Sequence, residues 1–404
     1  MDEFIGEDDM ISFPSATSLK DIEEAYQLLP ESSELKLETS LRFGGNVGVP
    51  GSLVQFLAAW SRTVEHPTLR PYGKGSSDLP EVLAREPHGM AAAYFSETIA
   101  SSAGSPLSTR EALANVIPRI EAMQDGNFRS TMHGRGAFLG CFARARNEFL
   151  VPLYSRAEVG AVRSREDFVN LTSRLIAACA PTTGQTMAES SRVALGTLLY
   201  ELFRNTDEHA TTDEHGRPYS KGLRAVMAKF ISFETKNAAA HLGEEDPPLS
   251  IFLLHNIANR RKYPNAEGKQ EATKQTSLLE LTVVDTGPGL ARRWLSRHGG
   301  GDDDITSLTI EEEVALVRKC FEMHATTKST AGSGGGLSHV LRMLQQLNAY
   351  LRLRTGRVCL TQDFSSPKEK VSFEPKHWLK NRPELPMAEG ACYSIVVPAS
   401  KVLL

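Results

Sequence analysis

In residues 34–184 the hydrophobic positions follow two spacings. Positions that alternate with polar residues predict strands, and positions three and four residues apart predict helices. The segments are a strand at 34–43, helices at 52–64 and 110–123, one or two strands at 138–154, and a helix at 165–180. Pro118 is expected to kink or break the second helix. The acidic, polar residues 1–33 are expected to be partly flexible. We therefore predict a small α/β domain over residues 34–184.

The turn-forming stretch 181–186, PTTGQT, interrupts this pattern and predicts a domain boundary, so that a second domain covers residues 185–404. Its strands are predicted at 223–234, 249–257, 278–285, 349–355, 357–362 and 392–398. Its helices are predicted at 198–210, 310–323 and 337–347. Thr309 and Glu312 form a capping-box pattern at the start of the second of these helices. Strands and helices in this order predict an α/β fold class, in the form of an α+β two-layer sandwich.

Composition narrows the functional classes. The chain of 404 residues is 41% hydrophobic and 23% charged, with a formal net charge of -4, so binding of nucleic acid is not expected. The five cysteines lack C-x-x-C spacing and are expected to be reduced thiols in a cytoplasmic protein. The acidic amino terminus and the absence of a run of 18 apolar residues give no sign of a signal peptide or a membrane span.

Residues 198–210, LLYELFRNTDEHA, hold the first candidate site. Glu201, Asn205 and His209 follow one another at intervals of four residues and so share one face of the predicted helix. That face presents a carboxylate, an amide and an imidazole beside a separate apolar face. Taken alone, such a row is more often a solvated helix face than a site.

The second candidate is the sequence Asp285-Thr286-Gly287-Pro288-Gly289, which follows an apolar strand. Asp285 could accept a hydrogen bond from an exocyclic amine such as that of adenine, and Gly287 and Gly289 would let backbone approach the ligand. The alternative is a turn in which the aspartate caps its own backbone, and for this short pattern alone that alternative is favoured.

The third candidate is the glycine cluster at residues 332–336, which directly precedes an amphipathic helix. Successive backbone amides and the positive end of a helix form an anion site suited to a polyphosphate, and Lys328 could add a charge. A flexible linker is the alternative, but a linker is not followed at once by a patterned helix, so the anion site is favoured.

Together these patterns resemble the Bergerat-fold (GHKL) ATPases, the superfamily of gyrase B, MutL, the heat-shock chaperones and histidine kinases. The resemblance rests on E-x-x-x-N-x-x-x-H in a helix, D-x-G-x-G after a strand, and T-T-K with G-x-G-x-G-L before a helix. The closing residues 390–398, GACYSIVVP, resemble the last strand of that domain. The likeness covers roughly residues 185–400.

The resemblance implies a role for each matching residue. Asn205 would ligate the Mg²⁺ that bridges the phosphates of ATP, Glu201 would act as the catalytic base or orienting group, and Asp285 would recognise adenine. His209 is as readily a helix-face histidine as a phosphate contact. The other positions implied to bind the nucleotide are Gly287, Gly289, Thr327, Lys328, Gly332, Gly334, Gly336 and Leu337.

Two departures from the family are visible. Ala391 stands where the family's last strand usually has a threonine that helps to hold adenine, and Ser394 or a water could compensate. The chain ends within a few residues of that strand and lacks an H-[DE]-x-x-x-P phosphoacceptor. The expected type is therefore a stand-alone ATPase or one similar to the anti-sigma-factor serine kinases, with a possible homodimer.

Two functions follow from this likeness. The first is a signalling ATPase or protein kinase that uses Mg²⁺ and ATP and binds a protein partner through residues 34–184. The second is an interaction module in which ATP closes a lid over residues 292–336 with little turnover. The other histidines, including His339, have no metal-site spacing and are expected to be surface or core residues.

Overall fold

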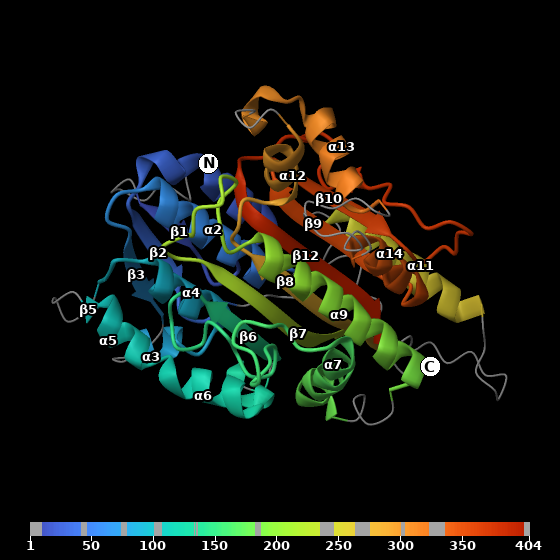
Figure 1. The fold of residues 1–404 in the computed structure, drawn as a ribbon, viewed down its shortest axis with the longest axis horizontal. Helices are drawn as coiled ribbons and strands as arrows, with labels where there is room; N and C mark the ends of the chain where they lie inside the picture. Colours follow the sequence, from blue (N-terminus) through green and yellow to red (C-terminus); the bar gives the residue numbers. More distant parts are fainter. Residues whose placement is uncertain are drawn as a thin grey trace.

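The computed structural model describes residues 10–41, 47–73, 79–100, 107–132, 134, 136–181, 187–234, 246–262, 275–299, 304–322 and 336–399. These residues form a mixed α/β structure with two sheets (Figure 1). No described helix is long and apolar enough to pass through a bilayer.

The smaller sheet has the order β1-β2-β3-β4-β5, and its first four strands are parallel. Its strands are β1 (Ile11–Phe13), β2 (Glu34–Glu38), β3 (Thr68–Tyr72), β4 (Thr98–Ile99) and β5 (Leu107–Ser108). The helices of this part are α1 (Leu19–Ala25), α2 (Val49–Thr63), α3 (Leu79–Leu83), α4 (Pro87–Phe95), α5 (Thr109–Ala114) and α6 (Ile117–Asp125), with the 3-10 helices η1 (Tyr26–Glu31) and η2 (Phe128–Thr131).

The larger sheet is antiparallel at every pairing and has the order β11-β10-β9-β12-β8-β7-β6. Its strands are β6 (Ala137–Phe142), β7 (Leu223–Glu234), β8 (Gln275–Asp285), β9 (Tyr350–Gly356), β10 (Val358–Asp363), β11 (Lys376–His377) and β12 (Ala388–Pro398). The helices are α7 (Arg165–Cys179), α9 (Glu189–His209), α11 (Pro247–Lys262), α12 (Leu290–His298), α13 (Ile310–Cys320) and α14 (Gly336–Gln346), with η3 (Ile305–Ser307) between α12 and α13.

The division between the sheets differs from the predicted boundary at residues 184 and 185. β6 pairs with β7, and α7 packs against α9, so both belong with the larger sheet. The sheets therefore divide the chain between β5 and β6. Most of the predicted boundary stretch, residues 182–186, lies outside the described residues.

Most predicted strands and helices are present, but one predicted strand is a helix. Residues 249–257 were expected to form a strand and instead belong to α11. Leu249, Phe252 and Leu253 are buried at helical spacing, whereas Ile251 and Leu254 are exposed. The continuous apolar run concealed this spacing, because a short run of that kind fits a buried strand equally well.

The larger sheet is covered on both faces, which adds a layer to the predicted two-layer sandwich. A Cβ atom placed on Gly51 of α2 would lie 2.7 Å from side-chain atoms of Thr282 and Cys392. α2 therefore packs on the face of β8 and β12 to which these side chains point. α7, α9 and α14 form the layer on the opposite face (Figure 1).

α2 is the central helix of the molecule. Every residue from Val49 to Trp60 is buried, because α4 and α1 cover the side that does not contact β12 and β8. A helix that is apolar on all sides is typical of such a position. Arg354 of β9 forms a buried ion pair with Glu23 of α1, with Nε 2.7 Å from Oε1. The amino-terminal elements are thus joined to the larger sheet through one continuous core.

Candidate functional site

α9 carries the predicted row of polar residues. Leu195, Leu199 and Leu202 are buried against the core, and α7 and α14 flank the helix. Gly196 allows α7 to approach closely, because a Cβ atom there would lie 2.4 Å from the Cα of Val169. Glu201 is buried, at 4% exposure, while Asn205 is half-buried.

Glu201 contacts two basic side chains. The sequence predicted neither contact. Arg165 at the start of α7 donates from Nη2 to Oε1 of Glu201 at 2.5 Å. His339 of α14, expected to be a surface or core residue, has its Nδ1 3.5 Å from the same oxygen. Both are far from Glu201 in the sequence. The one available signal was that His339 lies in the helix that follows the glycine cluster.

The start of α14 lies beside the carboxylate of Glu201. A Cβ atom on Gly336 would be 3.4 Å from Oε2 of Glu201. Leu337 is buried at the start of α14. The structure therefore brings the end of the glycine cluster to the predicted catalytic residue. Four other predicted nucleotide contacts, Thr327, Lys328, Gly332 and Gly334, lie outside the described residues.

Asp285 lies at the end of β8 and on the α9 side of the sheet. Thr282 and Val284 point towards α2, so the side chain of Asp285 points to the other face. Its partner across the sheet is Arg224, whose Nη1 contacts Asp207 of α9 at 2.6 Å. Opposed residues in a sheet share a face, which gives the same orientation for Asp285.

The carboxylate of Asp285 is buried, at 4% exposure, and accepts two backbone hydrogen bonds on Oδ1. The donors are the amides of Gly287 at 2.9 Å and Ala391 at 3.3 Å. Burial raises the pKa of Asp285 to about 7, against the opposing effect of these two hydrogen bonds. Because both bonds from the described residues end on Oδ1, Oδ2 can serve a ligand.

The two glycines after Asp285 allow close contacts, Gly287 with the end of α9 and Gly289 with the end of β9. A Cβ atom on Gly287 would lie 2.6 Å from the Cα of Ala210, the residue after His209. Gly289 has a φ of 84°, and a Cβ atom there would lie 2.8 Å from Oγ1 of Thr355. The expected alternative of an aspartate that caps its own turn is partly realised, since the Gly287 amide does bond to Asp285.

Arg293 of α12 holds the end of α9 in place. Its Nη2 donates to the carbonyl of His209 at 2.8 Å and to that of Thr212 at 2.6 Å. A cation at the carboxyl end of a helix is electrostatically favourable. His209 is therefore at the Asp285 end of α9, about 12 Å along the helix from Glu201. This position places it away from the expected phosphate end.

Ser394 is not positioned to replace the threonine that the resemblance would place at residue 391. A Cβ atom on Gly48, before α2, would lie 2.4 Å from Oγ of Ser394, which shows that this side chain is on the α2 face of the sheet. Asp285 is on the other face. Two buried hydroxyls lie near the turn after Asp285. That of Thr286 accepts from the amide of Leu223 at 2.9 Å. That of Thr355 accepts from the amide of Leu290 at 3.1 Å and donates to the carbonyl of Gly390 at 2.9 Å.

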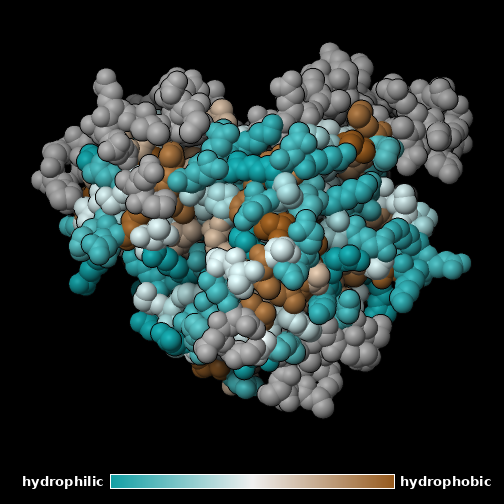
Figure 2. All heavy atoms as spheres, turned by 90° about the horizontal axis from the view of Figure 1, so that it is seen from above, coloured by the Kyte–Doolittle hydropathy of each residue, from teal (hydrophilic) through white to brown (hydrophobic). Residues whose placement is uncertain are grey.

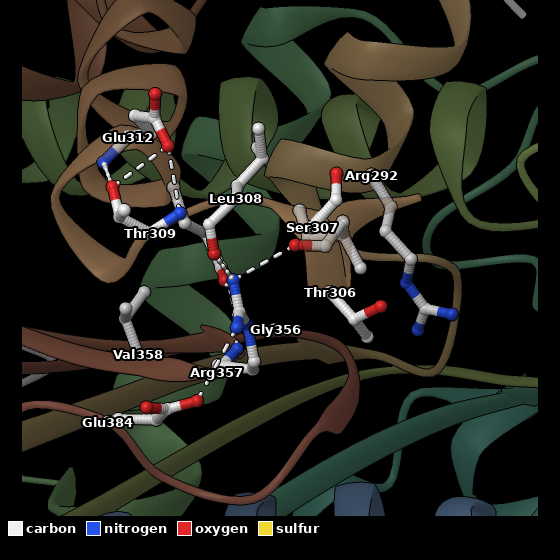
Figure 3. A network of polar contacts seen from close by, with 12 residues as sticks. Arg292, Thr306, Ser307, Leu308, Thr309, Glu312, Gly356, Arg357, Val358 and Glu384 are labelled. Carbon is white, nitrogen blue, oxygen red and sulfur yellow. Dashed lines mark hydrogen bonds and ion pairs between the residues drawn. The ribbon is translucent and has the colours of Figure 1, made fainter. Parts of the chain in front are cut away.

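The segment between α12 and α13 is fixed by Arg357 (Figure 3). Its guanidinium donates to the carbonyls of Ile305 at 2.9 Å and Leu308 at 2.7 Å and to Glu313 at 2.8 Å. The predicted capping box of Thr309 and Glu312 is present at the start of α13. These contacts anchor residues 305–320 within the larger range that was predicted to act as a lid.

The view from above in Figure 2 shows a largely hydrophilic surface with hydrophobic residues gathered near its centre. A cavity of about 360 Å³ lies elsewhere, between α6 and α7. Among the described residues, no group of three or more His, Cys, Asp or Glu side chains is arranged to hold a metal ion.

Comparisons with protein-family models, curated proteins and solved structures gave no match.

Proposed function

We propose that the protein binds ATP with Mg²⁺ in the manner of the Bergerat-fold proteins and acts as a signalling ATPase or protein kinase. The observation that carries this proposal is the meeting of three distant segments along α9. Gly336 lies at Glu201, and Gly287 lies at Ala210. These two contacts are about 13 Å apart along the helix. A nucleotide laid along α9 could therefore place its base at Asp285 and its phosphates at the start of α14.

The polar residues on this path suit such a ligand. Asn205 is half-buried one turn after Glu201, and its amide has no hydrogen bond to the described side chains. An amide oxygen can serve as one ligand of Mg²⁺, an ion that usually keeps several waters and takes others from phosphate. A bound Mg²⁺ would stabilise charge on the phosphates. Glu201 would orient or accept a proton from the attacking hydroxyl or water.

The contacts of Glu201 support a role in chemistry. The carboxylate is buried, yet its cationic partner Arg165 is half exposed and comes from a different helix. The Arg165 side chain can therefore move away from Glu201 without exposing a residue of the hydrophobic core. The raised pKa of Asp285 is also typical of a functional site, since a buried carboxylate without a cationic partner serves the fold poorly.

The test separates the enzyme from the nucleotide-gated interaction module. With labelled ATP, we expect Glu201→Gln to retain binding and to lose γ-phosphate release or transfer at least a hundredfold, because the amide cannot accept the proton. The matched control is Glu189→Gln in the first, exposed turn of the same helix, which should turn over ATP as the parent does. Unchanged turnover in Glu201→Gln would contradict its catalytic role. Binding without measurable turnover in the parent protein would favour the module.

A further inference from the structure

A pocket lies between α6 and α7, separate from the residues around Asp285 and Glu201. Its volume is about 360 Å³, within the range of small-molecule sites. The pocket is lined by the end of α6, residues of the 151–163 segment, and one face of α7. The opposite side of α7 packs on α9, where Phe168 contacts Phe203.

Three arginines converge on this pocket. Arg156 and Arg163 come from the segment before α7, and Arg174 comes from its third turn. Arg156 is exposed and makes no ion pair within the described part of the chain. Arg163 donates from Nε to the carbonyl of Val151 at 2.7 Å, and Arg174 donates from Nη2 to the carbonyl of Gly126 at 3.3 Å. Each guanidinium has five N–H donors, so most remain for a ligand.

The backbone at the end of α6 is shaped around one of these arginines. Gly126 has a φ of 74°, and a Cβ atom there would lie 1.9 Å from Nη2 of Arg174. A side chain at residue 126 would therefore displace this guanidinium. The ring of Phe128 packs against the same group, with 4.9 Å between the guanidinium carbon and the ring centre. These contacts hold Arg174 at the pocket wall.

The two acidic residues of the lining do not cancel this charge. Asp167 is occupied at the start of α7, where its Oδ2 accepts from the amide and hydroxyl of Ser164. Its Oδ1 lies 3.6 Å from Nη1 of Arg163. Asp125 is exposed at the end of α6. Three guanidinium groups thus face two carboxylates, of which one is already engaged.

We propose that this pocket binds a small multivalent oxyanion, phosphate or carboxylate in nature, through Arg156, Arg163 and Arg174. Planar guanidinium groups match both anions with paired hydrogen bonds. The size of the pocket favours a small metabolite. This proposal does not depend on ATP binding at α9.

The test is titration of the full chain with pyrophosphate and, separately, with citrate. We expect saturable binding of at least one, and the tighter of the two assigns a phosphate or a carboxylate ligand. Arg156→Gln should weaken binding roughly tenfold. Arg156 is exposed and makes no hydrogen bond or ion pair to the described residues, so we do not expect the change to unfold the protein. Asp125→Asn should tighten binding, since it removes a negative charge from the rim.

Two controls locate the anion. Arg110→Gln changes an exposed arginine of α5 outside the pocket and should leave binding unchanged. Asn205→Ala, at the phosphate end of the proposed nucleotide site, should also leave it unchanged, which separates this pocket from that site. The proposal is overturned if neither anion binds, or if binding is insensitive to both Arg156→Gln and Asp125→Asn.

Discussion

At the scale of single residues, Asp285 shows a conflict between stability and its proposed role. Its carboxylate is buried on the α9 face of the sheet and accepts two backbone hydrogen bonds, but no cation contacts it among the described residues. Burial dominates and raises its pKa to about 7. A charge held in this way reduces stability at neutral pH, which suggests that the residue is kept for a ligand.

This conflict predicts a pH-dependent effect of Asp285→Asn. The folded pKa of about 7 exceeds the ordinary value of 3.8, so the parent protein loses stability from this group as pH rises from 4 towards 7. The neutral amide avoids that loss. We expect the stability of Asp285→Asn relative to the parent to increase by about 2 kcal/mol or more between pH 5 and pH 8. Urea unfolding at both pH values measures it, and an equal difference at both would contradict the assignment.

At the scale of secondary-structure elements, the contact between α7 and α9 positions the candidate catalytic residue. Arg165 can reach Glu201 because Gly196 lets the two helices approach closely. The neighbour is the backbone of Val169, which cannot rotate away as a side-chain end can.

Gly196→Ala tests whether this approach matters. Helix propensity alone predicts stabilisation of about 1 kcal/mol, since glycine is a poor helix former. A methyl group 2.4 Å from the Cα of Val169 must separate the helices, so we expect a net destabilisation of about 1–3 kcal/mol. Denaturant unfolding decides the sign. Ser190→Ala, at an exposed position of the same helix, is the control and should change stability by less than about 0.5 kcal/mol.

Helices and strands marked by a local sequence pattern could be predicted, whereas the elements that they pack against could not. Apolar spacing predicted α9 and α14, and Thr309 with Glu312 marked the start of α13. α11 was mistaken for a strand because its apolar residues are continuous. The contacts of Arg165 and His339 with Glu201 join separate helices, and no local pattern records such contacts. The pairing of β6 with β7 is of the same kind.

At the scale of the whole molecule, both sheets share one core through α2. The buried pair of Arg354 and Glu23 adds a polar connection between α1 and β9. Removing one partner from such a pair is strongly destabilising, by about 3–5 kcal/mol, because the other charge remains buried. Because both sheets share this core, a ligand bound along α9 should stabilise the described fold as one cooperative unit.

The central claim is tested most directly by the thermal unfolding of the full chain with and without Mg²⁺ and ATP. The account predicts one transition, whose midpoint rises with ATP concentration in the parent protein. The rise should be lost or strongly reduced in both Asp285→Asn and Asn205→Ala, and it should be retained in Glu189→Gln. A midpoint that does not respond to ATP in the parent, or that rises equally in all of these variants, would contradict the account.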